Sequence, residues 1–164
     1  MGRLGGGGVT RVIELTRCYR FPAAHVLCHD SFDDDENLRV FGKCANPGGH
    51  GHNYGIEVTV TGPVDAESGE VMSRERLDAI VGERILRRFS HRLLNDDALF
   101  EERVPTAENI ARAIYHEIEA PVDAAGTARL CRVCVLETRK NRFEYADVDA
   151  SRGLNPAVSS PGAR

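Results

Sequence analysis

Apolar and polar residues alternate along two segments in the first half of the chain. From Thr10 to about Ala24, apolar side chains recur without helix signals, which is typical of a strand; they are Val12, Ile13, Leu15, Tyr19 and Phe21. Between Asn53 and Thr61 the alternation is strict and predicts a half-buried second strand. Its apolar positions are Tyr54, Ile56, Val58 and Val60.

The apolar spacing then changes to three and four residues, which predicts two helices. Ser73 can cap the first helix, whose apolar positions are Leu77, Ile80, Val81, Ile85, Leu86 and Phe89. The second begins near Thr106, whose hydroxyl can cap the first turn while Glu108 complements the positive helix end. We expect Pro121 to end this helix, and its apolar stripe is Ile110, Ile114 and Ile118.

Two further strands, at residues 130–138 and 143–148, complete the pattern. The order of two strands, two helices and two strands predicts an α+β domain, in which an antiparallel sheet carries the helices on one face. Such a sheet has exposed edges, and self-association is one way to cover them. We expect one folded domain at residues 10–150, between a flexible glycine-rich start at residues 1–9 and a flexible tail at residues 151–164.

The length of 164 residues suits a single domain with a substantial core. With 21 Lys and Arg against 25 Asp and Glu, the net charge of −4 argues against a nucleic-acid partner, because there is no broad basic surface. The sequence contains neither a signal peptide nor an apolar run of the roughly 20 residues that cross a membrane. Five cysteines, an odd number without an export signal, indicate reduced thiols and a cytoplasmic protein.

The densest group of chemically versatile side chains is Cys44-Ala-Asn-Pro-Gly-Gly-His50-Gly-His52-Asn-Tyr54. Residues two apart on a strand face the same side, so His50 and His52 can present two imidazoles to one zinc ion. An isolated His-x-His pair is more often a plain surface feature, but the flanking glycines and the upstream cysteine favour a metal site. Three protein ligands would leave the open position of a catalytic zinc site.

His25 is our candidate for the third ligand, because it shares strand parity with Phe21 and Ala23; His29 is the rival. Cys44 has two alternative roles. As a fourth ligand it would close the zinc site into a structural one. As a free side chain beside the metal, its thiolate would be a base or a nucleophile.

Cys131 and Cys134 form a Cys-x-x-Cys, which in isolation suggests a metal or redox site. They fall within an apolar strand, where residues three apart face opposite sides, so we interpret them as small buried core residues. Glu137 shares parity with Cys131, Val133 and Val135. A carboxylate on such an apolar face either pairs within the core or faces a ligand.

These motifs together resemble the 6-pyruvoyl-tetrahydropterin synthase family, which includes the 6-carboxytetrahydropterin synthases of bacterial queuosine biosynthesis. The resemblance runs from about Thr10 to Asp147 and is most specific at Phe41-Gly-Lys-Cys44-Ala-Asn-Pro-Gly-Gly-His50-Gly-His52-Asn-Tyr54. Further similar motifs are Phe21-Pro-Ala-Ala-His25, His91-Arg-Leu-Leu-Asn95, Pro105-Thr-Ala-Glu-Asn109 and Leu136-Glu137-Thr138.

The resemblance implies the tunnelling fold, in which ββααββ subunits form trimers and two trimers stack into a homohexamer with active sites between subunits. It also implies a zinc cofactor, held by His25, His50 and His52. The family's catalytic residues fall on Cys44 and His91, and its pterin-anchoring carboxylate falls on Glu137. Within the Pro105–Asn109 motif we assign a substrate contact to Thr106.

Five residues separate Cys44 from His50, the spacing that the resemblance links to the pyruvoyl synthases. The expected function is a zinc-dependent lyase that converts 7,8-dihydroneopterin triphosphate into 6-pyruvoyltetrahydropterin and releases triphosphate. The alternatives are a 6-carboxytetrahydropterin synthase and an inactive zinc- or pterin-binding paralogue. One departure bears on activity: Ser90 replaces the family's aspartate before the catalytic histidine, which removes a carboxylate partner for His91.

Overall fold

A computed structural model describes residues 12–146, so the expected flexible ends at residues 1–9 and 151–164 lie outside the described residues. Four strands form one antiparallel sheet in the order β1-β2-β3-β4. They are β1 (Ile13–His25), β2 (His50–Gly62), β3 (Arg129–Leu136) and β4 (Arg142–Ala146). The α+β prediction is confirmed, although β3 ends earlier than expected and leaves Glu137 just beyond the sheet.

The two predicted helices lie between β2 and β3 in the chain. The first consists of α2 (Arg74–Val81), a π-helical turn (Gly82–Leu86) and α3 (Arg87–Phe89), and short 3₁₀ turns at Leu94–Asp96 and Ala98–Phe100 follow it. The second is α4 (Ala107–Asp123). Both predicted caps are present: Ser73 accepts from the N–H of Arg76 at 3.3 Å, and Thr106 accepts from the N–H of Asn109 at 3.4 Å.

The prediction that Pro121 ends α4 is wrong, because the helix continues to Asp123. Proline removes its own N–H and crowds the carbonyl four residues earlier, but these costs do not stop the helix so close to its end. Two interactions hold the last turn in place. Val122 is fully buried in the core, and the N–H of Ala124 donates to the carbonyl of Ala120 at 3.0 Å.

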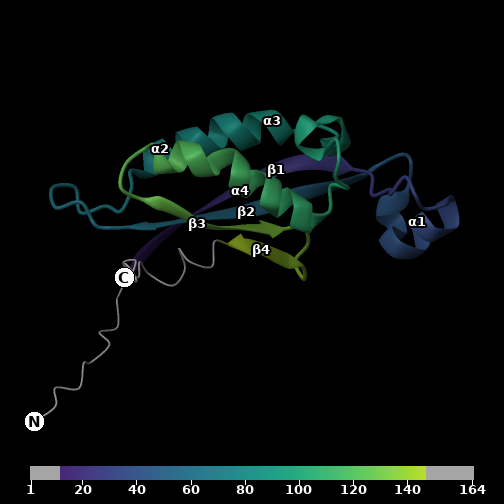
Figure 1. The fold of residues 1–164 in the computed structure, drawn as a ribbon, viewed down its shortest axis with the longest axis horizontal. Coiled ribbons are helices and arrows are strands. Elements are labelled where there is room, and N and C mark those ends of the chain that lie inside the picture. Colours follow the sequence, from purple (N-terminus) through teal and green to yellow (C-terminus); the bar gives the residue numbers. More distant parts are fainter. Residues whose placement is uncertain (1–11, 147–164) are drawn as a thin grey trace, which may run out of the picture.

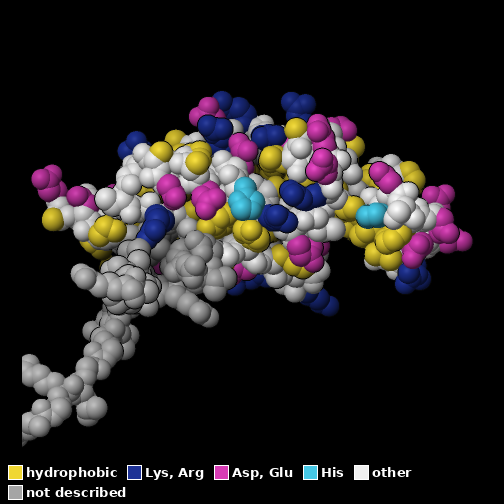
Figure 2. All heavy atoms as spheres, in the orientation of Figure 1, with side chains coloured by type: hydrophobic (Ala, Val, Ile, Leu, Met, Phe, Trp, Pro, Cys, Tyr) yellow, Lys and Arg dark blue, Asp and Glu magenta, His cyan; other side chains and the backbone are white. Residues whose placement is uncertain are grey.

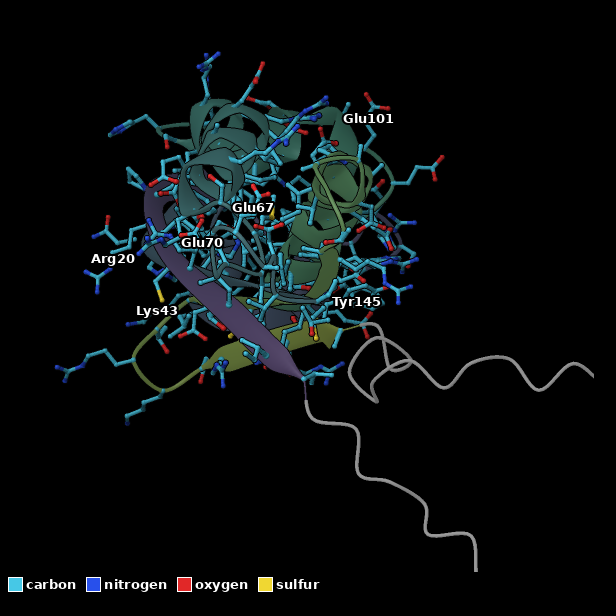
Figure 3. All side chains as sticks on the ribbon, turned by 90° about the vertical axis from the view of Figure 1, so that its left-hand side faces the viewer. Arg20, Lys43, Glu67, Glu70, Glu101 and Tyr145 are labelled. Atoms are coloured by element: carbon cyan, nitrogen blue, oxygen red, sulfur yellow. The ribbon has the colours of Figure 1, made fainter. Side chains whose placement is uncertain are left out.

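Both helices cover one face of the sheet, and the apolar core fills the space between the two layers (Figures 1 and 3). Fully buried members from both layers include Ile56, Val58, Leu77, Phe89, Ile110 and Ile114. The other face is polar: Arg142 pairs with Glu57 at 2.7 Å, and Cys134 accepts from the Nε of Arg142 at 2.8 Å. Cys131 and Cys134 are buried as expected, but neither belongs to the apolar core, because both thiols contact charged side chains: Cys131 lies 3.6 Å from Glu14, and Cys134 contacts Arg142.

A short helix that we did not predict, α1 (Asp34–Phe41), lies at the end of the sheet where β1 ends and β2 begins (Figure 1). Acidic side chains gather over this end (Figure 2), and Asp33 caps the helix by accepting from the N–H of Glu36 at 2.8 Å. Because α1 buries only Asn37, it lacks the apolar stripe that predicts a helix. Within residues 12–146, no helix is both long and apolar enough to cross a membrane.

Candidate metal centre and active site

Three histidines meet at one end of the β1–β2 pair. The antiparallel register places His25 opposite His50 and Ala23 opposite His52. The ring centres of His25 and His52 are 5.0 Å apart, and those of His50 and His52 are 4.6 Å apart. His25 is completely buried, on the same face as Phe21, as its strand parity predicted. Alternate residues of a strand face the same side, so the pairing of β1 with β2 alone brings these rings together.

A tight turn sends the chain from Cys44 back into β2 at His50. The N–H of Gly49 donates to the carbonyl of Asn46 at 2.9 Å, and Gly49 has a φ of +78°, a conformation that favours glycine. Cys44 lies in a 3₁₀ turn (Gly42–Ala45), and its carbonyl accepts from the N–H of Leu27 at 2.7 Å. This bond anchors Cys44 beside the chain that leaves β1.

The possible ligand atoms of His25, Cys44 and His52 all lie within 4.8 Å of one another. His50 is outside this group, although its ring lies next to that of His52. The rival His29 is exposed and its Nδ1 lies 2.8 Å from the hydroxyl of Ser31, away from the group. The geometry thus favours His25 over His29, and it keeps both alternatives for Cys44 open.

A backbone carbonyl fixes the proton on His25. The Nδ1 of His25 lies 2.9 Å from the carbonyl oxygen of Pro105, and a carbonyl can only accept, so Nδ1 carries the hydrogen. The Nε2 of a neutral His25 therefore presents a lone pair, and this buried atom has no hydrogen-bond partner in the described chain. The hydroxyl of Tyr54 lies 3.1 Å from the same Nδ1 and packs against the ring. Histidines that bind a metal through one ring nitrogen are commonly oriented in this way, by a hydrogen bond from the other nitrogen.

The Nε2 atom of His52 is likewise buried without a hydrogen-bond partner among the described residues. It lies 3.8 Å from a carboxylate oxygen of Glu137, and the Nε2 of His25 lies 4.0 Å from the same oxygen. Burial lowers the pKa of His25 and, with the neighbouring His25 and His50, lowers that of His52 to about 4. Two neutral imidazoles that face a carboxylate, with a thiol beside them, form a donor set that fits zinc.

The thiol of Cys44 favours its neutral form in the described chain without a metal. Burial, followed by the nearby Glu137 carboxylate, raises the pKa of the Cys44 thiol. In the described chain alone, Cys44 therefore remains a neutral thiol at pH 7. A cation bound by the histidines would favour the thiolate, as expected from the sequence, and that role of Cys44 stays a prediction.

The carboxylate of Glu137 lies beside His25 and His52 but accepts no hydrogen bond from the described chain. Its side chain is 15% exposed, and it makes no hydrogen bond within residues 12–146. Glu137 is partly exposed and no donor of the described chain satisfies its carboxylate, so it is not a satisfied core residue. It remains available to a cation or a ligand with N–H donors.

The other two predicted site residues are not among the grouped ligand atoms. His91 follows α3, is exposed, and has a φ of +60°, and its side chain makes no hydrogen bond among the described residues. The hydroxyl of Thr106 serves the cap of α4. The roles of His91 in catalysis and of Thr106 in substrate binding stay predictions.

Two contributors to the site did not emerge from the sequence. Tyr54 shares strand parity with His50 and His52, so that signal could have indicated a contact with their face. Pro105 acts through its backbone carbonyl, which every residue type carries, so no side-chain pattern reveals it.

The family model of 6-pyruvoyl tetrahydropterin synthase matches residues 14–147. The human 6-pyruvoyl tetrahydrobiopterin synthase is 37% identical over 141 residues, which cover 85% of this chain and 95% of the human protein. The Bacillus subtilis 6-carboxy-5,6,7,8-tetrahydropterin synthase is 29% identical over 137 residues, which cover 80% and 84%. The structure of Caenorhabditis elegans 6-pyruvoyl tetrahydropterin synthase aligns with a TM-score of 0.76 at 33% identity and covers 85% of this chain and 99% of that one. Together with the four-stranded sheet and its helices, these matches show that the chain has the tunnelling fold and belongs to the 6-pyruvoyl tetrahydropterin synthase family.

Proposed function

We propose that this chain is a zinc-dependent carbon–oxygen lyase that converts 7,8-dihydroneopterin triphosphate into 6-pyruvoyltetrahydropterin and releases triphosphate. The observation that carries this proposal is the convergence of two unpartnered imidazole nitrogens, from His25 and His52, on Glu137 beside Cys44 in the described chain. The names of the human and nematode relatives, with the five-residue spacing between Cys44 and His50, favour the pyruvoyl product over the carboxy product.

In this proposal His25, His50 and His52 hold the zinc ion. The neutral state of His25 and His52 suits metal binding, because no proton has to leave their ligand nitrogens at pH 7. The carbonyl of Pro105 keeps the ring of His25 oriented, as outer partners of metal ligands do. The bound zinc would supply Lewis acidity toward the hydroxyl groups of the substrate side chain and would favour the Cys44 thiolate.

Cys44 would transfer the protons at carbon during the rearrangement. Burial disfavours the charged thiolate, and a disfavoured thiolate is a stronger base once it forms. The hydrogen bond from Leu27 to the Cys44 carbonyl keeps this side chain near the cluster. His91 would exchange the other protons, from its exposed position at the end of α3.

Glu137 would accept two N–H groups of the pterin ring, a two-point contact that fixes the ring's orientation. Glu137→Gln should weaken pterin binding by roughly ten- to a hundredfold, because the amide loses the charge and presents a donor to other donors. The zinc content should not change. Titration with a pterin would measure the affinity, with the exposed Glu67→Gln as the matched control. Unchanged affinity in Glu137→Gln would remove Glu137 from the binding site.

The proposed assembly is a homohexamer built as a dimer of trimers. Two features support self-association: β1 and β4 are sheet edges, and large apolar side chains are exposed at both ends of the molecule. These side chains are Val12, Ile13, Leu38 and Val40. Sedimentation equilibrium at micromolar concentration should give six times the chain mass. The free thiols favour a reducing compartment, and we propose the cytoplasm.

Product analysis separates the candidate functions. The zinc-loaded protein is incubated with 7,8-dihydroneopterin triphosphate, and the pterins are identified by mass spectrometry. Formation of 6-pyruvoyltetrahydropterin with triphosphate supports the proposal. Formation of 6-carboxytetrahydropterin would assign the second function. Zinc binding without any product would leave a metal- or pterin-binding paralogue.

A further inference from the structure

The chain that follows α3 gives the edge strand β1 a short partner at its C-terminal end. The N–H of His91 donates to the carbonyl of Pro22 at 2.7 Å, and the N–H of Ala24 donates to the carbonyl of Arg92 at 2.9 Å. Ala24 and Leu93 form a parallel bridge between the two segments. The backbone of His91 is therefore attached to β1 only three residues before His25.

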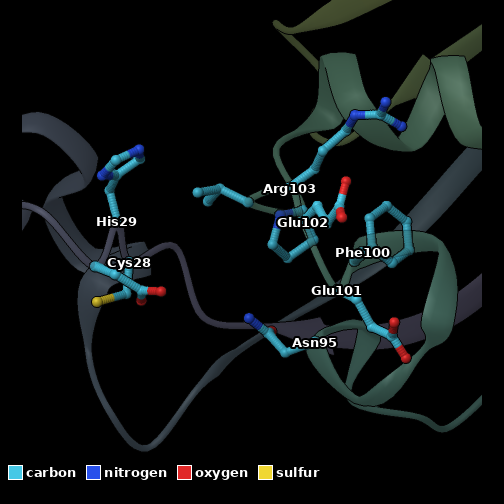
Figure 4. Close-up of a pocket in the computed structure, with 10 residues that line it drawn as sticks. Cys28, His29, Asn95, Phe100, Glu101, Glu102 and Arg103 are labelled. Atoms are coloured by element: carbon cyan, nitrogen blue, oxygen red, sulfur yellow. The ribbon is translucent and has the colours of Figure 1, made fainter.

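The side chain of Asn95 extends this pairing by one more step. Its carboxamide oxygen accepts from the N–H of Val26 at 2.8 Å, and its amide nitrogen donates to the carbonyl of Val26 at 2.8 Å. A carboxamide has the same donor and acceptor as a peptide group, so Asn95 pairs with Val26 as a neighbouring strand would. Asn95 lies between the segment with Cys28 and His29 and the segment with Phe100 and Glu101, at the pocket of about 340 Å³ shown in Figure 4.

Val26 stands between two residues of the candidate site. His25 precedes it, and Leu27 follows it and donates its N–H to the carbonyl of Cys44 at 2.7 Å. Asn95 therefore bonds to Val26, and Cys44 bonds to the next residue, Leu27, in the chain that leaves β1. Through Val26, a single side chain connects the segment of His91 with the chain that positions His25 and Cys44.

The backbone of His91 has a conformation that needs such support. Its φ of +60° is unfavourable for a residue with a Cβ atom, and such conformations persist where the surrounding hydrogen bonds determine them. The hydrogen bond to Pro22 holds one side of the segment, and the pair formed by Asn95 holds the other. If Asn95 is removed, the backbone bonds of His91 and Arg92 to β1 remain, but the segment loses its attachment to Val26.

We propose that Asn95 is a positioning residue, which locks the His91–Asn95 segment onto the strand end that carries His25 and thereby fixes where the imidazole of His91 is presented. Its consequence for turnover rests on the proposed function, in which His91 transfers protons. Asn95 itself contacts neither the cluster nor, in this proposal, the substrate.

The test uses the full-length zinc-loaded protein and the variants Asn95→Ala and Asn95→Asp. The aspartate keeps the shape and the acceptor but loses the donor to the Val26 carbonyl, so it remains informative if the alanine variant folds poorly. Asn141→Ala is the matched control, because Asn141 is exposed and its side chain makes no hydrogen bond in the described chain. Hydrogen exchange of the His91, Ala24 and Val26 amides, zinc content, kcat and KM are measured for each protein.

In both Asn95 variants we expect the His91 and Ala24 amides to exchange about tenfold faster or more, with the zinc content unchanged. The Val26 amide should exchange faster in Asn95→Ala alone, because aspartate keeps the oxygen that accepts its hydrogen bond. We expect kcat to fall severalfold while KM changes little, and the control to match the starting protein. Unchanged exchange in both Asn95 variants would overturn the lock, and faster exchange with unchanged kcat would overturn its role in positioning His91. If the starting protein makes no product, the proposed function fails. The exchange rates would still show whether Asn95 holds the His91–Asn95 segment on β1.

Discussion

The histidines at the strand ends and His91 occupy opposite environments. His25 is buried, its proton is fixed by the carbonyl of Pro105, and burial lowers the pKa of both His25 and His52. His91 lies at the surface on a left-handed backbone, and its side chain has no hydrogen bond in the described chain. A single chain thus brings the candidate ligands together at one end of its sheet and presents His91 at the surface. A rigid sheet suits metal ligands, while a surface residue can serve a site shared with another copy.

The largest effect should come from removing two imidazoles of the cluster. His50→Ala combined with His52→Ala should lose essentially all bound zinc, because a single remaining histidine cannot hold the ion. Metal analysis after dialysis would measure the zinc per chain. His29→Ala, at an exposed histidine of the preceding loop, should keep one zinc per chain. Full zinc in the double variant would contradict the proposed ligands.

Replacing the thiol should separate chemistry from metal binding. Cys44→Ala should keep the zinc and the oligomer and lower kcat by at least about a hundredfold, the usual loss when a general base is removed. Cys28→Ala is the control, because Cys28 is an exposed cysteine outside the ligand group. If Cys44→Ala instead releases its zinc, then Cys44 is a ligand and the site is structural.

The metal-free protein should lose stability in acid because of the buried imidazoles. The pKa of His52 is about 4 in the folded chain, whereas an ordinary histidine has a pKa of 6.5, so between these values the unfolded chain binds more protons. The contribution of His52 is complete above pH 6.5 and is lost as the pH falls toward 4, a decrease of roughly 2–3 kcal/mol in the free energy of unfolding.

Urea unfolding of the zinc-free protein at several pH values would measure this decrease. His52→Asn should flatten the dependence between pH 6.5 and 4, whereas His91→Asn should leave it as it is, because His91 is exposed. An equal response of the two variants would show that burial does not distinguish these histidines.

The smallest effect should come from restoring a carboxylate beside His91. Ser90→Asp should move the acidic limb of the pH–rate profile to higher pH and raise kcat by less than about tenfold, since a carboxylate stabilises a neighbouring imidazolium. Asp97 does not already fill this role in the described chain, because Arg88 binds its carboxylate at 2.6 and 2.7 Å. No shift in Ser90→Asp, together with loss of activity in Asp96→Asn, would show that Asp96 supplies the charge.

The sequence by itself determined the elements whose information is local. Strict alternation from Tyr54 to Val60 predicted β2, and parity predicted that His25, His50 and His52 face one side. Ser73 and Thr106 were recognisable as helix caps, because a cap bonds to a backbone group only three residues away. The sequence motifs alone also indicated the family, which the matching family model confirms.

Only the tertiary structure decided which distant groups meet. In the structure His25, and not His29, joins the group of possible ligands. Helix α4 continues beyond Pro121, and α1 forms although it has no apolar stripe. The tertiary structure also brought the carbonyl of Pro105 to His25 across 80 positions of sequence, and the carboxamide of Asn95 to Val26 across 69. Periodicity reports which face of its own element a side chain occupies. The partner that the side chain meets there depends on how the elements pack, and in these two contacts a backbone group, which all residues share, forms one side of the bond.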